Sequence, residues 1–333
     1  MSFFTIEKNK NSLVVKFSNR AKGITNSFLN GGFMENLQAI FNYTLSQDDL
    51  DNLENKDLYH FLKEKSIELG LDYQKTQALV TKANMYNASL SVKTYKKTKV
   101  ATISTGGVRV NASCAGDPNS YFEENGKFKA GTINLIILID GNLNETTLLE
   151  GILTATEAKS AVFSDLLISS NFSNKIATGT GTDGISIISN SESPEKFTNA
   201  SKHSKLGELI GLSVIEAIKK TLKNEMNLSP KSQSNALVRI SRIEKESKKF
   251  YESTRYNKFE IVKSLKENMY DSCVIAITSL VINLIDQSTV DLINKEIAYK
   301  IAIFNINNYL KEEKYFSYKL LLRFICEKNL NHV

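Results

Sequence analysis

A nearly unbroken apolar run at residues 131–140 (GTINLIILID) constrains the fold of this chain most strongly. Its length fits a β-strand, and its apolar residues occupy consecutive positions instead of alternating, so both faces of the strand are expected to be buried. A second strand is predicted at residues 99–104, and the loop between the two is rich in Gly, Asn and Asp. The sequence therefore predicts a sheet with other elements packed on both of its faces.

Helical patterns indicate what covers this sheet. Residues 145–168 and residues 204–223 place apolar side chains at helical spacing, and alanines in the first of these segments would allow close approach to a sheet. A shorter helix is predicted at residues 56–69. Strands and helices do not alternate regularly enough for a doubly wound fold. We therefore expect an α+β domain at residues 1–228, a mixed β-sheet covered by helices.

The pattern changes beyond Pro230. Residues 231–333 contain no glycine, keep helical periodicity, and carry 17 Lys or Arg against 12 Asp or Glu, whereas the rest of the chain has 25 against 24. Because acidic residues are interleaved and no aromatic-basic platform is present, solvated helices explain this charge better than nucleic-acid binding does. We expect an all-α C-terminal domain at residues 229–333, whose role is open, with homo-oligomerisation or partner binding through its helices as the alternative.

Cysteine content and apolar runs suggest the compartment. Cys114, Cys273 and Cys326 are too few and too scattered for a disulfide framework or a paired-cysteine metal site. The N-terminal residues interrupt apolar positions with charge, and the longest apolar run, residues 273–285, is shorter than the ~20 residues that cross a bilayer. We therefore expect a cytoplasmic protein without membrane or nucleic-acid partners. The absence of paired histidines argues against tightly bound catalytic zinc, and no tightly bound cofactor is expected.

Residues 178–184 (TGTGTDG) form the clearest candidate site, since glycines alternate there with hydroxyl side chains. Such a turn can present successive backbone N–H groups to an anion or to a developing oxyanion. A nucleotide-binding glycine loop would open directly into a helix, whereas the β-rich residues 185–188 follow here. A Rossmann or P-loop site is therefore excluded. The alternative is a glycine-rich hairpin turn without any chemistry.

Charged residues near this turn in the sequence are candidate acid–base groups. Glu157 and Lys159 lie within a helix of small and apolar residues, so at least one of them is expected to face a pocket, where a carboxylate becomes a usable base. His203 precedes the next predicted helix, and histidine is suited to proton transfer near neutral pH. The alternatives are a solvent-facing glutamate and an exposed histidine.

Polar residues beside the predicted strands complete the candidates. Asn111 follows the segment that begins at Thr105, and Asn134 interrupts the apolar run. Their side-chain amides can orient a substrate amide, or they can satisfy backbone groups in turns. The pair Gly131-Thr132 also permits self-cleavage that exposes an N-terminal threonine nucleophile, although nothing else in the sequence supports it.

Short motifs follow one another in a specific order along residues 1–225. They are 31–32 (GG), 70–72 (GLD), 105–112 (TGGVRVNA), 115–117 (AGD), 131–134 (GTIN), 156–159 (TEAK), 178–184 (TGTGTDG) and 205–211 (KLGELIG). This series resembles the adenosylcobinamide amidohydrolase (CbiZ) family. The resemblance implies hydrolysis of the amide between the corrin side chain and aminopropanol in adenosylcobinamide, yielding adenosylcobyric acid in cobinamide salvage towards coenzyme B12. The cobalt-containing corrinoid is then the substrate and not a cofactor.

Amide hydrolysis requires a base or nucleophile, donors for the oxyanion and an acid for the leaving amine. The candidate base is Glu157, with His203 or Asp183 in proton transfer and Thr180 or Thr182 as nucleophile or donor. The backbone of residues 179–183 is the candidate oxyanion cradle. The candidate substrate-binding residues are Gly179, Gly181, Asn111, Asn134, Thr105 and Lys159.

Three alternatives to this function stay open at the level of sequence. The chain could bind a corrinoid or a nucleotide without turnover. It could hydrolyse complete adenosylated cobamides, such as pseudocobalamin, instead of adenosylcobinamide. Thirdly, residues 1–228 could be a scaffold whose functional part is the C-terminal helical domain, which the family resemblance does not cover.

Overall fold

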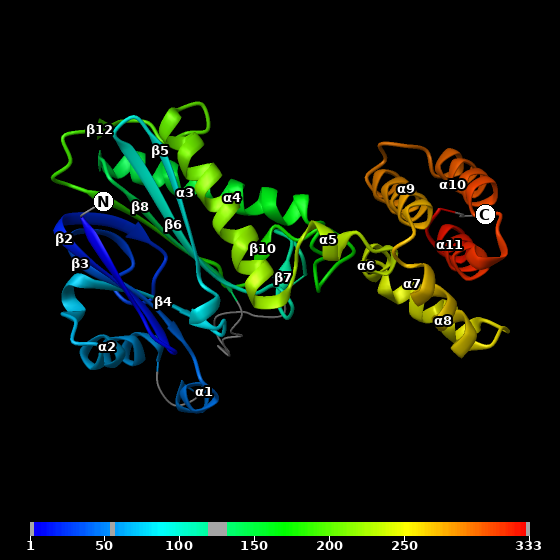
Figure 1. Cartoon of the computed structure of the whole chain (residues 1–333), viewed down its shortest axis with the longest axis horizontal. Helices are drawn as coiled ribbons and strands as arrows, with labels where there is room; N and C mark the ends of the chain where they lie inside the picture. Colours follow the sequence, from blue (N-terminus) through cyan, green and yellow to red (C-terminus); the bar gives the residue numbers. More distant parts are fainter. Residues whose placement is uncertain (1–2, 54–56, 119–131, 331–333) are drawn as a thin grey trace. The chain divides into compact units, whose positions relative to one another are not determined.

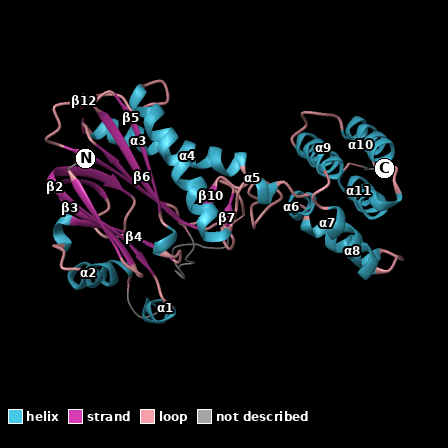
Figure 2. Cartoon of the chain, viewed as in Figure 1, coloured by secondary structure: helices cyan, strands magenta, loops and turns pink. Residues whose placement is uncertain are grey.

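The computed structural model describes residues 3–53, 57–118 and 132–330, apart from the side chains of residues 244–247. The chain divides into two compact units, Met1–Ser229 and Pro230–Val333 (Figure 1). The first unit contains the main β-sheet and the second unit is helical (Figure 2).

An eight-stranded mixed sheet forms the centre of the first unit. Its strands are β1 (Phe4–Lys8), β2 (Ser12–Thr25), β3 (Gly32–Thr44), β4 (Thr76–Thr81), β5 (Ser89–Tyr95), β6 (Thr98–Gly106), β8 (Ile133–Ile139) and β11 (Gly184–Asn190). Their order is β4-β3-β2-β11-β8-β6-β5, with β1 beside β2. The pairs β3–β4 and β8–β11 are parallel and the other pairs are antiparallel. The predicted α+β class with a mixed sheet is confirmed.

Strand β8 is buried on both faces, as its apolar run predicts. Alternate residues of Ile133–Ile139 pack into a core with helices α3 (Glu145–Asp165) and α4 (Lys205–Met226). On the other face, Ile136 and Leu138 share a separate core with Leu79 of β4. The second cover is therefore another part of the same sheet and not a helix. The sheet curves through the long strands β2 and β3, so that β4 packs on the face of β8. There Asn134 Nδ2 of β8 donates to the Val80 carbonyl of β4 at 2.9 Å.

Capping side chains fix the ends of the two long helices. Asn144 accepts a hydrogen bond from the Thr147 amide at the start of α3, and Ser204 accepts one from the Gly207 amide at the start of α4. Helix α4 ends at Asn227, which adopts a left-handed conformation with φ of 54°. Both helices pack on each other and on the sheet (Figure 2). They therefore hold one face of β6, β8 and β11 in place.

The remaining elements of the first unit are short. They are helices α1 (Gln47–Leu53) and α2 (Leu58–Glu68), the 3₁₀ turns Tyr73–Lys75 and Met85–Asn87, and strands β7 (Ala112–Ser113), β9 (Asn142–Leu143), β10 (Gly179–Thr180) and β12 (Lys196–Phe197). Helix α2 covers the outer face of β3 and β4, where Phe61 and Leu62 pack against Phe41 and Ala78. Strand β10 pairs with β7, and β12 pairs with β9.

The second unit is a helical domain with its own core. Its helices are α5 (Pro230–Gln233), α6 (Ala236–Ser241), α7 (Glu244–Ser253), α8 (Lys258–Asn268), α9 (Ser272–Thr289), α10 (Lys295–Tyr309) and α11 (Phe316–Asn329). Within the described ranges, α9 alone has the length and apolar character to cross a membrane, which is weak evidence because core helices share both properties. Its buried residues, Val274 and Val281 among them, belong to the core of this unit.

Candidate active site

The turn at residues 178–184 connects the region after α3 to β11 and is anchored at its first residue. Ser160 Oγ of α3 donates to the Thr178 carbonyl at 2.9 Å, and Thr178 Oγ1 accepts from the Ala115 amide at 2.9 Å. Gly179 lies so close to α3 that a Cβ atom there would stand 2.6 Å from Lys159 Nζ and 2.3 Å from Asp183 Oδ2. Only glycine therefore fits at this position without displacing charged groups.

Lys159 and Asp183 form a buried ion pair beneath the turn, with side chains 8% and 11% exposed. The Asp183 carboxylate also accepts hydrogen bonds from the Thr180 amide at 3.1 Å, from Thr180 Oγ1 at 2.5 Å and from the Ile133 amide at 3.1 Å. A buried ion pair is tolerated when further hydrogen bonds satisfy its charges in this way. Through Asp183, the pair consequently connects α3, the turn and the start of β8.

The backbone N–H groups of the turn are partly used inside the protein. The Thr180 amide donates to Asp183, and the Gly181 amide donates to the Asn111 carbonyl at 3.2 Å. An N–H group that already has a carboxylate or carbonyl partner must break that bond before it can hold an oxyanion. The Thr180 and Gly181 amides are therefore the least suited of residues 179–183 to the predicted oxyanion cradle.

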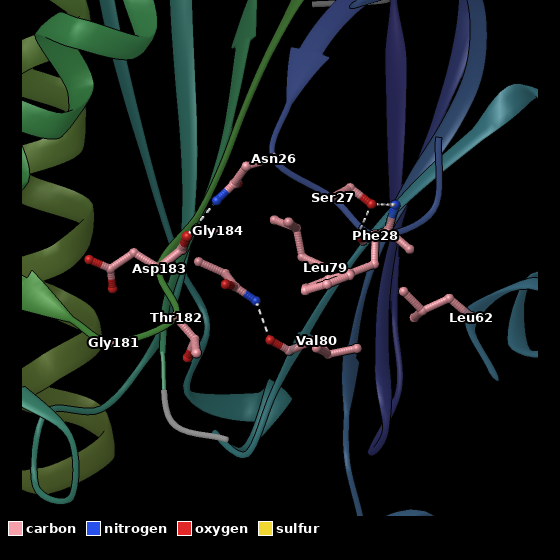
Figure 3. A pocket seen from close by; sticks show the side chains of 12 residues that line it. Asn26, Ser27, Phe28, Leu62, Leu79, Val80, Gly181, Thr182, Asp183 and Gly184 are labelled. Atoms are coloured by element: carbon pink, nitrogen blue, oxygen red, sulfur yellow. Dashed lines mark hydrogen bonds between the residues drawn. The ribbon is translucent and has the colours of Figure 1, made fainter. Parts of the chain in front are cut away.

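A cavity of about 260 Å³ opens between the turn and the strands that fold over β8 (Figure 3). Phe28, Leu79 and Val80 lie across the cavity from residues 181–184. Asn26 joins the two sides, since its Nδ2 donates to the Asp183 carbonyl at 2.7 Å and its Oδ1 accepts from the Ile185 amide at 2.9 Å. The Asp183 carboxylate points away from the cavity. At this residue the turn therefore presents its main chain, and not its side chain, to the cavity.

A buried polar network beside this cavity links four strands. Asn134 Nδ2 of β8 donates to Asn42 Oδ1 of β3 at 2.9 Å, and Asn42 Nδ2 donates to Thr105 Oγ1 of β6 at 2.5 Å. Because Asn134 Nδ2 also bonds the Val80 carbonyl, both of its N–H groups are used inside the protein. Sequence reasoning named Asn134 and Thr105 but missed Asn42. The available signal was an amide side chain between aromatic residues of a strand, in FNYT at residues 41–44.

Thr132 lies where the turn, β8 and the polar network meet. Its Oγ1 is 2.5 Å from the Thr182 carbonyl and 3.0 Å from Asn134 Oδ1, and the residue is 3% exposed. Thr132 and Asn111 line a second cavity of about 190 Å³. Thr81, which lines this cavity, directly follows Val80, which lines the first cavity, so the two cavities are neighbours. The sequence singled out Thr132 only through cleavage after Gly131, and Gly131 lies outside the described residues.

Two predicted acid–base residues lie outside these cavities. The Glu157 side chain is 53% exposed and forms an ion pair with Lys202, and His203 is exposed. Neither lines either cavity. Lys159 is buried in its ion pair with Asp183, but it too lines neither cavity, so neither residue faces a cavity as expected. The helical period explains why Lys159 and not Glu157 is buried, because Lys159 follows buried Ala155 by four positions, whereas Glu157 is rotated about 200° from Ala155.

An acidic residue beside the turn shows how the neighbouring loop is held. Asp117 Oδ2 accepts hydrogen bonds from the Cys114 amide at 2.7 Å and from Ser170 Oγ at 2.5 Å. Burial acts to raise the pKa of Asp117, but these hydrogen bonds and one from the Ser173 hydroxyl outweigh it and lower the pKa below its usual range. Asp117 is therefore a charged anchor for the strand β7, which pairs with the turn.

The described residues contain no group of three or more His, Cys, Asp or Glu side chains that could hold a metal ion. What the site offers is hydroxyl groups, side-chain amides and one buried ion pair. Such groups suit nucleophilic attack, hydrogen bonding to an amide and charge stabilisation.

Two solved structures align with this chain at low similarity. The PH0078 protein from Pyrococcus horikoshii aligns with a TM-score of 0.33 and 11% identity, over 68% of this chain and 79% of that one. A beta-aminopeptidase from Burkholderia sp. aligns with a TM-score of 0.32 and 10% identity, over 67% of this chain and 82% of that one. TM-scores this low do not establish a shared fold.

Sequence comparisons are more specific. The uncharacterized protein MJ1613 of Methanocaldococcus jannaschii is 30% identical over an alignment of 232 residues, and the match covers 64% of this chain and 87% of that protein. Residues 2–230 match the family model described as adenosylcobinamide amidohydrolase. The matched residues coincide with the first unit, which contains the turn, the ion pair and both cavities.

Proposed function

Since this chain belongs to the adenosylcobinamide amidohydrolase family, we propose that it hydrolyses the amide between the corrin side chain and aminopropanol in adenosylcobinamide, yielding adenosylcobyric acid. The observation that carries this proposal is the family match over residues 2–230. The match covers every residue named in the candidate site and ends where the helical unit begins. The second unit is therefore outside the proposed chemistry.

We place the scissile amide at Thr132, between the two cavities. The Thr132 hydroxyl has one proton and two oxygen acceptors nearby, Thr182 O and Asn134 Oδ1, so its orientation is set by the protein. A hydroxyl fixed in this way is a candidate nucleophile towards a carbonyl carbon, or a positioning group for the attacking water. Because Asp183 holds the Ile133 amide, the Lys159–Asp183 pair positions the backbone next to this hydroxyl.

The first cavity suits the corrin side of the amide. Its wall includes the apolar side chains of Leu62, Leu79 and Phe28, and Phe28 is 56% exposed at its edge. Ligand sites in proteins are mostly apolar with a few placed polar groups, and this cavity has that character through Asn26 and Asn134. The corrin ring is too large to enter, so the cavity would take the amide-bearing arm while Phe28 contacts the ring edge.

Incubation of the full-length protein with adenosylcobinamide tests this function. We expect stoichiometric release of 1-amino-2-propanol and adenosylcobyric acid, both measured by mass spectrometry. A spectral change of the corrinoid without release of the amine would mean binding without turnover and would contradict the proposal. Parallel reactions with a complete adenosylated cobamide decide whether the larger substrate is also cleaved.

A further inference from the structure

The second cavity carries a charge arrangement that amide hydrolysis alone does not require. Lys82, which follows β4, and Arg109, in the loop after β6, both line it and are exposed. Neither side chain forms an ion pair with any residue that the structure describes. Both cations are therefore available to a ligand in the cavity.

The acid that lines the same cavity is already engaged. Glu225 near the end of α4 accepts a hydrogen bond from Asn87 Nδ2 at 2.7 Å and from the Asn84 amide at 3.3 Å. Both carboxylate oxygens thus accept hydrogen bonds from Asn84 and Asn87, the N-cap and the last residue of the Met85–Asn87 turn, instead of pairing with a cation. With two cations and one acid among its lining residues, the cavity has an excess of one positive charge.

The position of Lys82 and Arg109 determines which part of the substrate they would contact. Thr132, where we place the scissile amide, lines this cavity together with Asn111, which is 7% exposed. If the corrin side occupies the first cavity, the leaving aminopropanol arm extends into the second. In adenosylcobinamide this arm ends in a neutral hydroxyl, which gives Lys82 and Arg109 no charged partner. An ester of that hydroxyl with phosphate would place an anion within the arm, a few bonds from the amide nitrogen.

We propose that the second cavity is an anion subsite that holds a phosphate ester on the aminopropanol arm, an inference that rests on the proposed amide hydrolysis. Arg109 supplies a planar set of donors that matches phosphate oxygens, and Lys82 supplies a point charge. The phosphate is either the monoester of a phosphorylated cobinamide or the diester of a complete cobamide. These two sources share the chemistry that the subsite recognises, and separate assays distinguish them.

Steady-state kinetics with three substrates test the subsite: adenosylcobinamide, its phosphate monoester and a complete adenosylated cobamide. For at least one phosphate-bearing substrate, Arg109→Ala and Lys82→Ala should each raise KM about tenfold with little change in kcat, since a charged hydrogen bond to phosphate is lost. The KM for adenosylcobinamide should stay within about twofold. Arg20→Ala is the matched control, because Arg20 is an exposed arginine near the opposite end of β11.

Direct binding separates this subsite from the hydrolase proposal. The probe is the phosphate ester of 1-amino-2-propanol, titrated calorimetrically into the full-length protein. Wild type and Arg20→Ala should bind it equally, and Arg109→Ala should weaken binding about tenfold. Equal binding by Arg109→Ala and Lys82→Ala, or equal KM effects on all three substrates, would overturn the subsite while leaving adenosylcobinamide hydrolysis intact. Arg109-dependent binding without turnover of any corrinoid would overturn the hydrolase proposal alone.

Discussion

The two units use polar side chains in different ways. In the first unit a buried ion pair, Lys159–Asp183, and a network of side-chain amides gather at one end of the sheet, next to two cavities. In the second unit polar groups fix helices: Asp271 caps α9, and Tyr318 Oη donates to the Leu265 carbonyl at 2.9 Å. Polar groups that face cavities indicate a site, whereas polar groups that close helices indicate a scaffold.

A cysteine of the second unit illustrates its scaffold character. Cys326 is fully buried in the helical core, and burial, aided by nearby Glu327, raises the pKa of its thiol to about 12. A thiol that stays protonated is a poor nucleophile, so it contributes packing and no chemistry. Thr132 of the first unit, in contrast, lines a cavity, and this difference predicts where substitutions change activity and where they change only stability.

Substitution of Thr132 should produce the largest effect on activity. We expect Thr132→Ala to lower kcat on the order of 10³-fold, because the positioned hydroxyl is lost, and Thr132→Ser to retain most of the activity. The measurement is aminopropanol release, with circular dichroism and the unfolding midpoint checked for each variant. Wild-type turnover by a folded Thr132→Ala protein would remove Thr132 from the chemistry.

Breaking the buried ion pair should produce the largest effect on stability. Lys159→Met leaves the Asp183 charge buried without its partner, so we expect the free energy of unfolding of the first unit to fall by about 3–5 kcal/mol. The double variant Lys159→Met/Asp183→Asn should be less destabilised than Lys159→Met, since no unpaired charge is left and the side-chain oxygen at position 183 can still accept the hydrogen bonds from Thr180 and Ile133. Urea unfolding followed separately for each unit measures this. Equal losses in Lys159→Met and in the double variant would show that an unpaired charge at Asp183 is not what destabilises the single variant.

The loss of stability in acid should be a smaller effect, and it should differ between the two units. Hydrogen bonds from Lys220 and Lys93, opposed by burial, lower the pKa of Glu216 in α4 to about 2. A carboxylate with a lowered folded-state pKa stabilises the fold above its usual pKa, and this contribution is lost as the pH falls towards 2. Glu216→Gln should therefore reduce the difference in first-unit stability between pH 6 and pH 3. The second-unit transition, where the pKa of Asp271 is also lowered, should keep its own pH dependence.

The pKa of Asp271 is also lowered, but by different contacts. Burial acts to raise its pKa, but hydrogen bonds from the Tyr315 hydroxyl and from the Val274 and Cys273 amides outweigh it. Its stabilisation of the second unit is therefore present near neutral pH and lost in acid. If Glu216→Gln altered the acid response of the second unit instead of the first, the assignment of these two carboxylates would be wrong.

Substitutions at Glu157 and His203 should have small effects. Both residues are exposed and line neither cavity, and exposed ion pairs such as Glu157–Lys202 contribute little to stability. We expect Glu157→Gln and His203→Ala to keep kcat/KM within about twofold of wild type. A loss of more than about 100-fold in either variant would restore the hypothesis that these residues transfer protons.

The sequence predicted the class of fold and the segments of the site better than the side chains that compose it. The apolar run of β8 correctly predicted burial on both faces, but which element covers each face depends on long-range strand pairing, and β4 covers one of them. Local patterns also left open which charged residue of α3 points inward, and the structure shows that it is Lys159 and not Glu157. Asn42 was missed because its partners, Asn134 and Thr105, are far away in the sequence.

The most direct test of the account compares residues 1–229 with the full-length chain in the adenosylcobinamide assay. The first unit has its own cores and contains the whole candidate site, so the truncated protein should fold. We predict that it releases aminopropanol with kcat/KM within about threefold of the full-length protein. A folded, inactive 1–229 protein beside an active full-length chain would contradict the claim that the first unit alone carries the hydrolase.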